Sequence, residues 1–329
     1  MPPTRWGIAG PGAIAAKLAP EFSYVADAEL LAIGSRSLQR AEAFAQTHGA
    51  ERAYGSYAEL VGDPDIELIY VATPHPQHLA IALAALRAGK GVLVEKAFTA
   101  TLAGAEELVG EARGRGVFAM EAMWTRFQPA VIRARELLAD GAIGDIVAVQ
   151  ADLGVSREYD PADRLFARET GGGLLLDLGV YLVSFAQMLL GDPETVCAVG
   201  TYAANGVEVS ASLLLGWEDG RGATLTSSLH SPLPGEARIF GTRGRIEILP
   251  RFHHPTRFVL HREGRAPEPF TARPLGDGYA EELIEATRAV RAGRTESTVM
   301  PLDDTLAVMA VLEQAASQLG VTYREAAEK

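Results

Sequence analysis

The chain has 329 residues, and its 30 basic residues against 42 acidic ones give a formal net charge of −12. This length suits two domains that each bury a core, and the negative charge opposes binding to nucleic acid or to an anionic membrane surface. We therefore expect a protein whose main partner is a small molecule.

The first third of the chain alternates short apolar runs with amphipathic helical patterns. The predicted strands are 5–9, 29–34, 68–72, 91–94 and 117–120, and the predicted helices between them include 78–88 and 101–115. Such alternation is typical of parallel strands joined by right-handed crossovers. We predict an α/β fold in which residues 1–123 form a doubly wound, dinucleotide-binding Rossmann domain.

Strand patterns dominate after residue 124. Beyond a predicted helix over 129–139, the predicted strands are 146–153, 195–202, 207–215, 223–229, 238–241 and 246–249. Short connections favour an open, mostly antiparallel sheet, so residues 124–329 are predicted to form an α+β domain that binds the substrate. The last helical patterns, 279–292 and 303–319, are expected to pack back on the first domain.

The predicted strand 207–215 has apolar residues at alternate positions, which gives the sheet one apolar face. The helix predicted over 173–190 is expected to cover it. The other face is of mixed polarity, and two interpretations stay open: it pairs with a second subunit in a homodimer, or it is solvated.

Two features bear on the compartment. Cys197 is the only cysteine, so no disulfide forms within the chain, and its apolar neighbours predict a buried thiol. The longest apolar run, 171–183, carries Asp177 in its middle and is too short to span a bilayer. We expect a soluble, cytoplasmic protein.

A glycine-rich turn, Gly10-Pro11-Gly12-Ala13-Ile14-Ala15, follows the first predicted strand and leads into a helical pattern. A pyrophosphate needs a close backbone and unpaired N–H donors, so small residues at this turn predict a dinucleotide site that includes Gly10, Gly12, Ala13 and Ile14. A glycine-rich loop without a ligand is the alternative interpretation.

The second predicted strand ends in Ser35-Arg36 rather than in the carboxylate that usually binds the ribose 2′-hydroxyl of NAD. A hydroxyl and a guanidinium suit a 2′-phosphate, so NADP is favoured over NAD. Arg40 follows one helical turn later and either assists or is solvated.

Two further groups of residues are candidates for chemistry. Glu95-Lys96 follows a buried strand and lies at the sheet edge where open α/β folds bind ligands. Asp177 and Tyr181 are four residues apart in an apolar predicted helix, so they are expected to share a face. The structural alternatives are a solvated Glu-Lys loop, and a turn-capping aspartate beside a core tyrosine.

Together these motifs resemble the large family of glucose-fructose oxidoreductase and inositol dehydrogenase-like enzymes (Gfo/Idh/MocA), over essentially the whole chain. The residues that carry the resemblance are Gly10 to Ala15, Ala72-Thr73-Pro74 with His78, 88–96, and Gly171-Gly172-Gly173 leading to Asp177 and Tyr181. The stretches 120–127 and 176–181 are most similar to the branch with dihydrodiol and NADP-dependent D-xylose dehydrogenases, which carries tyrosine where many relatives carry histidine.

The resemblance implies hydride transfer between a nicotinamide and a hydroxyl-bearing carbon of a sugar or a cyclic diol. The catalytic residues would be Lys96, Asp177 and Tyr181: Tyr181 or Lys96 takes the substrate proton, and Asp177 orients the substrate hydroxyl or the ammonium. A tyrosine has an ordinary pKa near 10, and the Lys96 ammonium would lower it. The usual Glu-Lys-Pro is here Glu95-Lys96-Ala97, so no proline fixes the direction of the lysine.

The resemblance also implies which residues contact the ligands. Thr73, Pro74 and His78 would line the ribose side of the cofactor, Glu95 would reach the nicotinamide ribose, and Ser35 with Arg36 would meet the 2′-phosphate. The candidate residues of the substrate pocket are Trp124, Arg126, Arg164 and Tyr279. His253-His254 has no third ligand at a suitable spacing, so we interpret it as a loop and predict no metal site.

Two alternatives to a simple dehydrogenase remain. The first is an enzyme that retains its cofactor, which either shuttles hydride between two sugars or oxidises the substrate transiently during glycoside cleavage. The second is a non-catalytic NADP-binding sensor, which has no use for Lys96, Asp177 and Tyr181 together.

Overall fold

The computed structural model describes residues 2–326, which divide into two compact units. Over these residues the first unit comprises 2–122, Leu275–Thr305 and 324–326, and the second comprises Met123–Pro274 and Leu306–Tyr323. The first unit is therefore built from distant parts of the chain. Trp6 Nε1, for example, donates to Thr287 Oγ1 at 3.3 Å.

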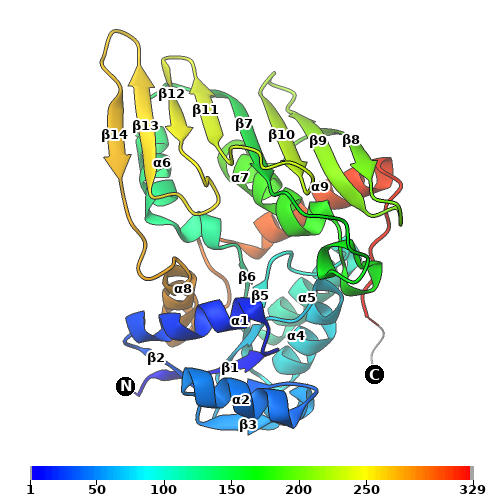
Figure 1. Ribbon diagram of the computed structural model, residues 1–329. Helices are drawn as coiled ribbons and strands as arrows, with labels where there is room; N and C mark the ends of the chain where they lie inside the picture. The colour runs from blue at the N-terminus through cyan, green and yellow to red at the C-terminus, as the bar shows by residue number, and fades with distance from the viewer. Residues whose placement is uncertain (1, 327–329) are drawn as a thin grey trace. The chain divides into compact units, whose positions relative to one another are not determined.

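The first unit contains a parallel sheet with the strand order β3-β2-β1-β4-β5-β6 (Figure 1). Its strands are β1 (Thr4–Ala9), β2 (Ala28–Gly34), β3 (Arg52–Tyr54), β4 (Leu68–Val71), β5 (Gly91–Glu95) and β6 (Ala119–Ala122). The central strands read as continuous apolar runs because helices cover both faces. This order is that of a Rossmann fold, which confirms the prediction for the first domain.

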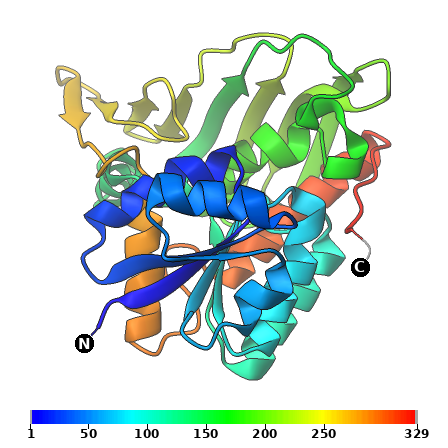
Figure 2. The same cartoon turned by 60° about the horizontal axis from the view of Figure 1, so that its bottom comes forward.

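Helices of the first unit follow most strands. They are α1 (Ala13–Leu18), η1 (Ala19–Tyr24), α2 (Leu38–His48), α3 (Tyr57–Gly62), η2 (His75–Gln77), α4 (His78–Arg87), α5 (Leu102–Arg115) and α8 (Ala280–Arg291). Ser37 and Thr101 cap α2 and α5 by accepting backbone N–H groups, as small hydroxyl residues do at helix starts. In Figure 2, α4 and α5 (cyan) lie on one side of the sheet and α8 (orange) lies on the other.

The second unit contains a larger sheet in the order β14-β13-β12-β11-β7-β10-β9-β8. Its strands are β7 (Ile146–Gly154), β8 (Thr195–Tyr202), β9 (Glu208–Gly216), β10 (Gly222–Ser228), β11 (Ala237–Gly241), β12 (Gly244–Ile248), β13 (Arg257–Arg262) and β14 (Glu268–Thr271). The strands β7 and β10 pair in parallel, whereas the other neighbouring strands in this order pair antiparallel. The predicted open, mostly antiparallel sheet is confirmed.

Helices α6 (Pro129–Ala139), α7 (Val180–Leu190) and α9 (Leu302–Gln318) lie along one face of this sheet (Figure 1). The shorter helical turns of the second unit are η3 (Trp124–Phe127), η4 (Arg164–Phe166), η5 (Arg168–Thr170) and the π-helical turn η6 (Leu175–Gly179). Among residues 2–326, Arg168–Leu190 is long and apolar enough to cross a membrane, but 78% of its most apolar window is buried within the protein. Such burial is typical of a core helix.

Three features differ from the sequence-based expectations. Strands β3, β13 and β14 were not predicted; β14 contains Pro269, which suits only a sheet edge. Most of α9 belongs to the second unit rather than the first, and the Gln318 side chain there donates to the Val196 carbonyl of β8. Cys197 is exposed, because Val196 takes the helix-covered face of β8 and its neighbour takes the other.

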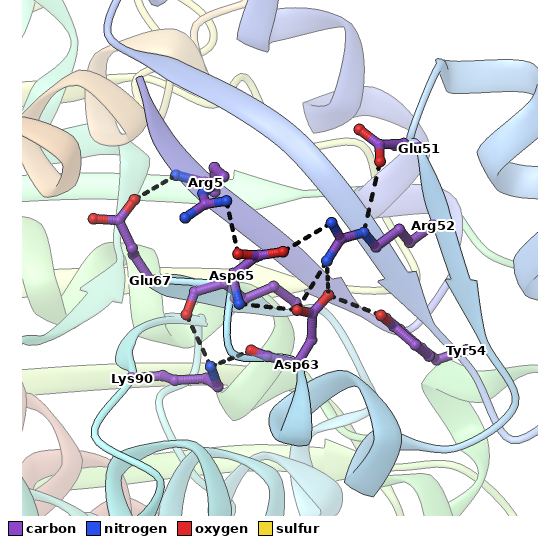
Figure 3. A network of polar contacts seen from close by, with 9 residues as sticks. Arg5, Glu51, Arg52, Tyr54, Asp63, Asp65, Glu67 and Lys90 are labelled. Atoms are coloured by element: carbon purple, nitrogen blue, oxygen red, sulfur yellow. Dashed lines mark hydrogen bonds and ion pairs between the residues drawn. The ribbon is translucent and has the colours of Figure 1, made fainter. Parts of the chain in front are cut away.

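A polar network joins the β3 end of the first sheet to the chain that leads into β4 (Figure 3). The carboxylate of Asp63 is almost fully buried and accepts from Arg52 Nη1 at 2.8 Å, from the Tyr54 hydroxyl at 2.8 Å and from the Asp65 N–H at 2.9 Å. Lys90 Nζ donates to the Asp63 carbonyl. Burial raises the pKa of Asp63, but these hydrogen bonds outweigh it and hold the pKa below its ordinary value.

We expect Asp63→Ala to lower the free energy of unfolding by about 2 kcal/mol, because it leaves the Tyr54 hydroxyl and the Asp65 N–H without their acceptor. Chemical denaturation followed by circular dichroism measures this change. The control is Glu51→Ala, whose side chain is 72% exposed and lies 3.7 Å from Arg52; it should leave stability unchanged. Equal losses for both variants would contradict the structural role of the buried carboxylate.

Candidate active site

A cavity of about 500 Å³ lies in the first unit, where the strands β1, β2 and β4 end. This edge of a parallel sheet is where open α/β folds bind ligands. Its lining residues are Gly10, Pro11, Gly12, Ser35, Arg36, Ser37, Arg40, Tyr57, Ala72, Thr73, Pro74 and Gln77. The lining therefore brings together the predicted phosphate turn, the predicted 2′-phosphate residues and the Thr73-Pro74 segment, while Ala13 and Ile14 begin α1 beside them.

The turn after β1 depends on a glycine. Gly10 has a φ of +104°, and a Cβ there would lie 3.1 Å from the Ala72 carbonyl oxygen and 3.0 Å from Thr73 Cγ2. A side chain would fill the space between the two strand ends. The Thr73 hydroxyl is buried and has no hydrogen-bond partner among residues 2–326. A bound dinucleotide would fit both features, because it needs the open turn and supplies polar atoms for the hydroxyl.

One part of the cavity gathers positive charge. Arg36 and Arg40 are exposed, and both lie near enough to Tyr57 to act on its phenol: burial raises the pKa of Tyr57, and the two guanidinium groups oppose this. Ser35 is buried, and its Oγ accepts the Ser37 N–H at 3.2 Å. Tyr57 also lines this cavity and was not among the predicted site residues.

Glu95 and Lys96 close strand β5 of the first unit. Glu95 is 8% exposed and accepts a hydrogen bond from the Tyr70 hydroxyl of β4, while Lys96 is half-buried. The peptide bond between Lys96 and Ala97 is cis. The structure thus places Glu95 and Lys96 at the predicted sheet edge.

Two imidazoles fix the backbone around Lys96. His75 Nε2 lies 3.2 Å from the Lys96 carbonyl oxygen, and His78 Nδ1 lies 3.0 Å from that of Ala97. His78 Nε2 also lies 2.7 Å from the Thr73 carbonyl oxygen. Burial lowers the pKa of His78 to about 4, so the ring is neutral at pH 7.

His78 was expected to line the cofactor's ribose side, but its ring is fully buried and absent from the cavity lining among the described residues. It instead ties the Thr73 turn to the backbone after Lys96. The sequence analysis did not assign His75 a role, although its position directly after Pro74 placed it in the same motif.

In the second unit, Asp177 lies in the π-helical turn η6, and Tyr181 is the second residue of α7. The structure therefore replaces the continuous α-helix predicted from residue 173 by a wider turn before α7. Arg164 Nη2 lies 3.1 Å from Asp177 Oδ1, and the aspartate side chain is 16% exposed. Two of the predicted site residues are thus an ion pair. π-turns of this kind occur frequently at functional sites.

Tyr181 belongs to an aromatic cluster with Trp124, His253 and His254. The Tyr181 and His253 rings have centroids 5.3 Å apart, and those of Trp124 and His254 are 5.0 Å apart. Thr125 Oγ1 donates to the His253 carbonyl at 2.7 Å, which fixes this loop between β12 and β13. The two histidines do lie in a loop, and among residues 2–326 no group of histidine, cysteine and carboxylate side chains could hold a metal ion.

Two predicted substrate residues lie in other surroundings. Arg126 is 1% exposed, and its guanidinium donates to Ser184 Oγ at 3.0 Å and to Gln187 Oε1 at 2.6 Å. It fastens η3 to α7, which differs from the expected place in a pocket wall. Tyr279 belongs to the first unit, at the start of α8, where burial and the Glu95 carboxylate raise its pKa. Lys96 also belongs to the first unit, and Asp177 and Tyr181 belong to the second.

Comparison with known proteins agrees with this division. Residues 4–123 match the oxidoreductase family with an NAD-binding Rossmann fold, and residues 131–247 match the GFO/IDH/MocA C-terminal domain. Among curated proteins, trans-1,2-dihydrobenzene-1,2-diol dehydrogenase from Xenopus tropicalis is 38% identical over 97% of this chain and 99% of its own. The enzyme of the same name from Homo sapiens is 36% identical over 97% of this chain and 98% of its own.

Solved structures share the whole fold. A 3-ketoreductase from Actinomadura kijaniata, in complex with NADP and TDP-benzene, has a TM-score of 0.86 at 29% identity and covers 96% of this chain and 98% of its own. Aldose-aldose oxidoreductase from Caulobacter crescentus, complexed with glycerol, has a TM-score of 0.87 at 26% identity and covers 97% and 98%. The chain belongs to the GFO/IDH/MocA family of oxidoreductases.

Proposed function

We propose that this protein is an NADP-dependent dehydrogenase that transfers a hydride between the nicotinamide and a hydroxyl-bearing carbon of a cyclic diol or a sugar. The observation that carries the proposal is the cavity in the first unit, with its open Gly10 turn, its orphan Thr73 hydroxyl and its pair of arginines. The dihydrodiol dehydrogenases, similar over nearly their whole length, support the substrate class.

The choice of NADP rests on charge. The segment that ends β2 and enters α2 offers Arg36 and Arg40 and no carboxylate between them. A 2′-phosphate has negative charge and acceptor oxygens, which guanidinium groups bind well. The 2′-hydroxyl of NAD has no negative charge to pair with the two arginines. The ketoreductase solved with NADP supports this choice.

When bound, the nicotinamide supplies or accepts the hydride. In the proposed reaction Tyr181 moves the proton of the substrate hydroxyl, and its phenol needs a nearby cation to act as a base at neutral pH. Lys96 would supply that cation, and the Asp177 carboxylate, paired with Arg164, would orient the substrate hydroxyl. These joint roles are proposed from the family resemblance, since Lys96 and the other two residues belong to different units.

The aromatic cluster of the second unit supports a substrate with an apolar ring face. The Tyr181 ring contacts the half-buried imidazole of His253, and the Trp124 ring contacts the imidazoles of His253 and His254, so polar nitrogen atoms belong to this aromatic cluster. An aromatic face packs on the C–H face of a sugar or on the ring of a cyclic diol. We propose that this cluster, with Arg164, forms the substrate wall.

A second candidate function is a sugar oxidoreductase that retains its cofactor. The similarity to the aldose-aldose oxidoreductase favours this reading, because two sugars are named for that enzyme. Cofactor that survives purification, together with turnover that needs two sugars and no added NADP, would distinguish it from a simple dehydrogenase.

Two experiments test the function. The protein is titrated with NADPH while the quenching of its fluorescence is recorded, and the formation of NADPH is followed by absorbance after NADP and each member of a panel of trans-dihydrodiols and aldoses are added. We expect Tyr181→Phe to lower kcat by about 100-fold, because the proton-transfer group is lost, while the Kd for NADPH stays within about twofold. The matched control is Tyr202→Phe on β8, which should keep wild-type turnover. Unchanged kcat in Tyr181→Phe would move proton transfer to Lys96.

Arg36→Ala should raise the Kd for NADPH by about 30-fold, because it removes charge-assisted hydrogen bonds to the 2′-phosphate, and should change the Kd for NADH by less than about threefold. Fluorescence titration with both cofactors measures this. Arg115→Ala, an exposed arginine on α5 that pairs with Glu111, is the control and should change neither Kd. An equal loss for both cofactors would remove Arg36 from the 2′-phosphate site.

We also propose a homodimer formed through the face of the second sheet that the helices leave uncovered. Val199 is 70% exposed and Leu214 is 57% exposed, and Leu214 lies opposite the exposed Cys197 in the register of β8 and β9. Clustered apolar side chains on one face favour association. Sedimentation velocity should give twice the chain mass of 35.0 kDa, and Leu214→Glu should give the monomer; a monomeric wild type at micromolar concentration would refute the proposal.

A further inference from the structure

Glu208, the first residue of β9, has a carboxyl group that is buried in the second unit. Strict alternation along 207–215 would put its side chain on the face of mixed polarity, but the register between β8 and β9 shifts where Tyr202 pairs with Glu208, and the side chain is 0% exposed. A buried carboxyl group is costly unless it is hydrogen-bonded, so its partners show what it is there for.

The partners of Glu208 are the start of the π-helical turn and a tyrosine near the end of the chain. Glu208 Oε1 accepts the Leu175 N–H at 3.1 Å and also accepts the Tyr323 hydroxyl. Leu175 is the first residue of η6, and Asp177 is its third. One oxygen atom therefore fixes the N-terminal end of the turn that carries the candidate catalytic carboxylate.

Two glycines before this turn lie in close contact with neighbouring groups, and one of them, Gly173, lies against the Glu208 carboxyl group. Gly173 has a φ of +141°, and a Cβ there would lie 2.3 Å from Glu208 Oε1. A Cβ on Gly172 would lie 2.5 Å from the Arg164 carbonyl oxygen. The chain thus packs directly on the carboxyl group on one side and on the Arg164 segment on the other, which leaves the turn little freedom to shift.

We infer that Glu208 and Tyr323 are positioning residues, which hold the π-helical turn so that Asp177 meets Arg164 and the substrate hydroxyl in one fixed geometry. This inference rests on the proposed function of Asp177. Neither residue touches the reacting atoms: Glu208 acts through the Leu175 N–H, and Tyr323 acts through Glu208. Burial raises the pKa of Glu208, and the hydrogen bonds from Tyr323 and Leu175 oppose this rise.

The inference is tested by measuring kcat in three variants, together with the Kd for NADPH, whose proposed site lies in the first unit. In Glu208→Gln the amide oxygen keeps both hydrogen bonds of Oε1, and its NH₂ group takes the place of Oε2, which has no partner among residues 2–326. We expect kcat within about threefold of wild type. Glu208→Ala should lower kcat by about 100-fold, because a loosened turn misplaces the carboxylate, and Tyr323→Phe should lower it by about fivefold. The Kd for NADPH should stay within about twofold in all three.

Hydrogen exchange followed by mass spectrometry supplies a reading that does not need turnover. Exchange of the segment 174–180 should speed up at least tenfold in Glu208→Ala and stay at the wild-type rate in Glu208→Gln. The matched controls are Glu218→Ala, an exposed glutamate just after β9, and Tyr202→Phe, which removes another tyrosine hydroxyl bonded near the end of α9. Both controls should keep wild-type kcat and exchange.

The outcomes separate the two proposals. Two results in Glu208→Ala would show that Glu208 has only a structural role and would overturn the inference. In the first, kcat and the affinity for NADPH fall together; in the second, exchange of 174–180 speeds up while kcat stays unchanged. An unchanged exchange rate in Glu208→Ala also overturns it. If the wild type turned over no member of the panel, the proposed function would fail, and the exchange rates alone would decide whether Glu208 holds the turn.

Discussion

The close approach of two backbone segments at Gly10 decides what the first unit can bind. β1 and β4 are neighbours in the sheet, so the turn after β1 runs against the Ala72-Thr73 segment after β4. A Cβ atom on Gly10 would lie about 3 Å from atoms of Ala72 and Thr73. Because glycine has no Cβ, no side chain fills this place, and a cavity lies beside the two segments. Thr73 and the two arginines after β2 line the cavity beside this contact.

A glycine with positive φ and closely packed neighbours also occurs in the second unit, at Gly173, where it has a different role. At Gly10 the missing side chain leaves room for a ligand, whereas at Gly173 it leaves room for the protein's own carboxyl group, Glu208. Glycine-rich segments in one chain can therefore have opposite physical roles, and the local sequence does not distinguish them. The distinction comes from what lies opposite: a turn beside a cavity in the first case, and a buried hydrogen-bond acceptor in the second.

Local patterns predicted the features that neighbouring residues determine. The alternation of strand and helix patterns predicted the doubly wound Rossmann domain, and α6 has the bounds predicted for it, 129–139. Partners distant in sequence were not predictable in this way. The sequence around Glu208 does not indicate that Tyr323, 115 residues later, donates a hydrogen bond to it. The sequence around Trp124 likewise does not indicate the ring contact with His254. Arg126 shows the reverse error: a charged residue next to a pocket motif is bonded to α7.

Two histidine side chains from the segment after β4 contact the backbone around Lys96. The sequence has Ala97 after the Glu95-Lys96 pair, so no proline ring restricts this segment, and the direction of the lysine has to be fixed by its surroundings. Two buried imidazoles, of His75 and His78, lie against the carbonyl oxygens of Lys96 and Ala97, and His78 also reaches the Thr73 turn. Because burial keeps the His78 ring neutral above pH 5, the ring has one N–H, which donates to one of these two carbonyl oxygens, and it brings no second positive charge beside the lysine. One buried ring therefore packs between the Thr73 carbonyl group beside the cavity and the Ala97 carbonyl group after the candidate catalytic lysine, which places these two segments next to each other within the first unit.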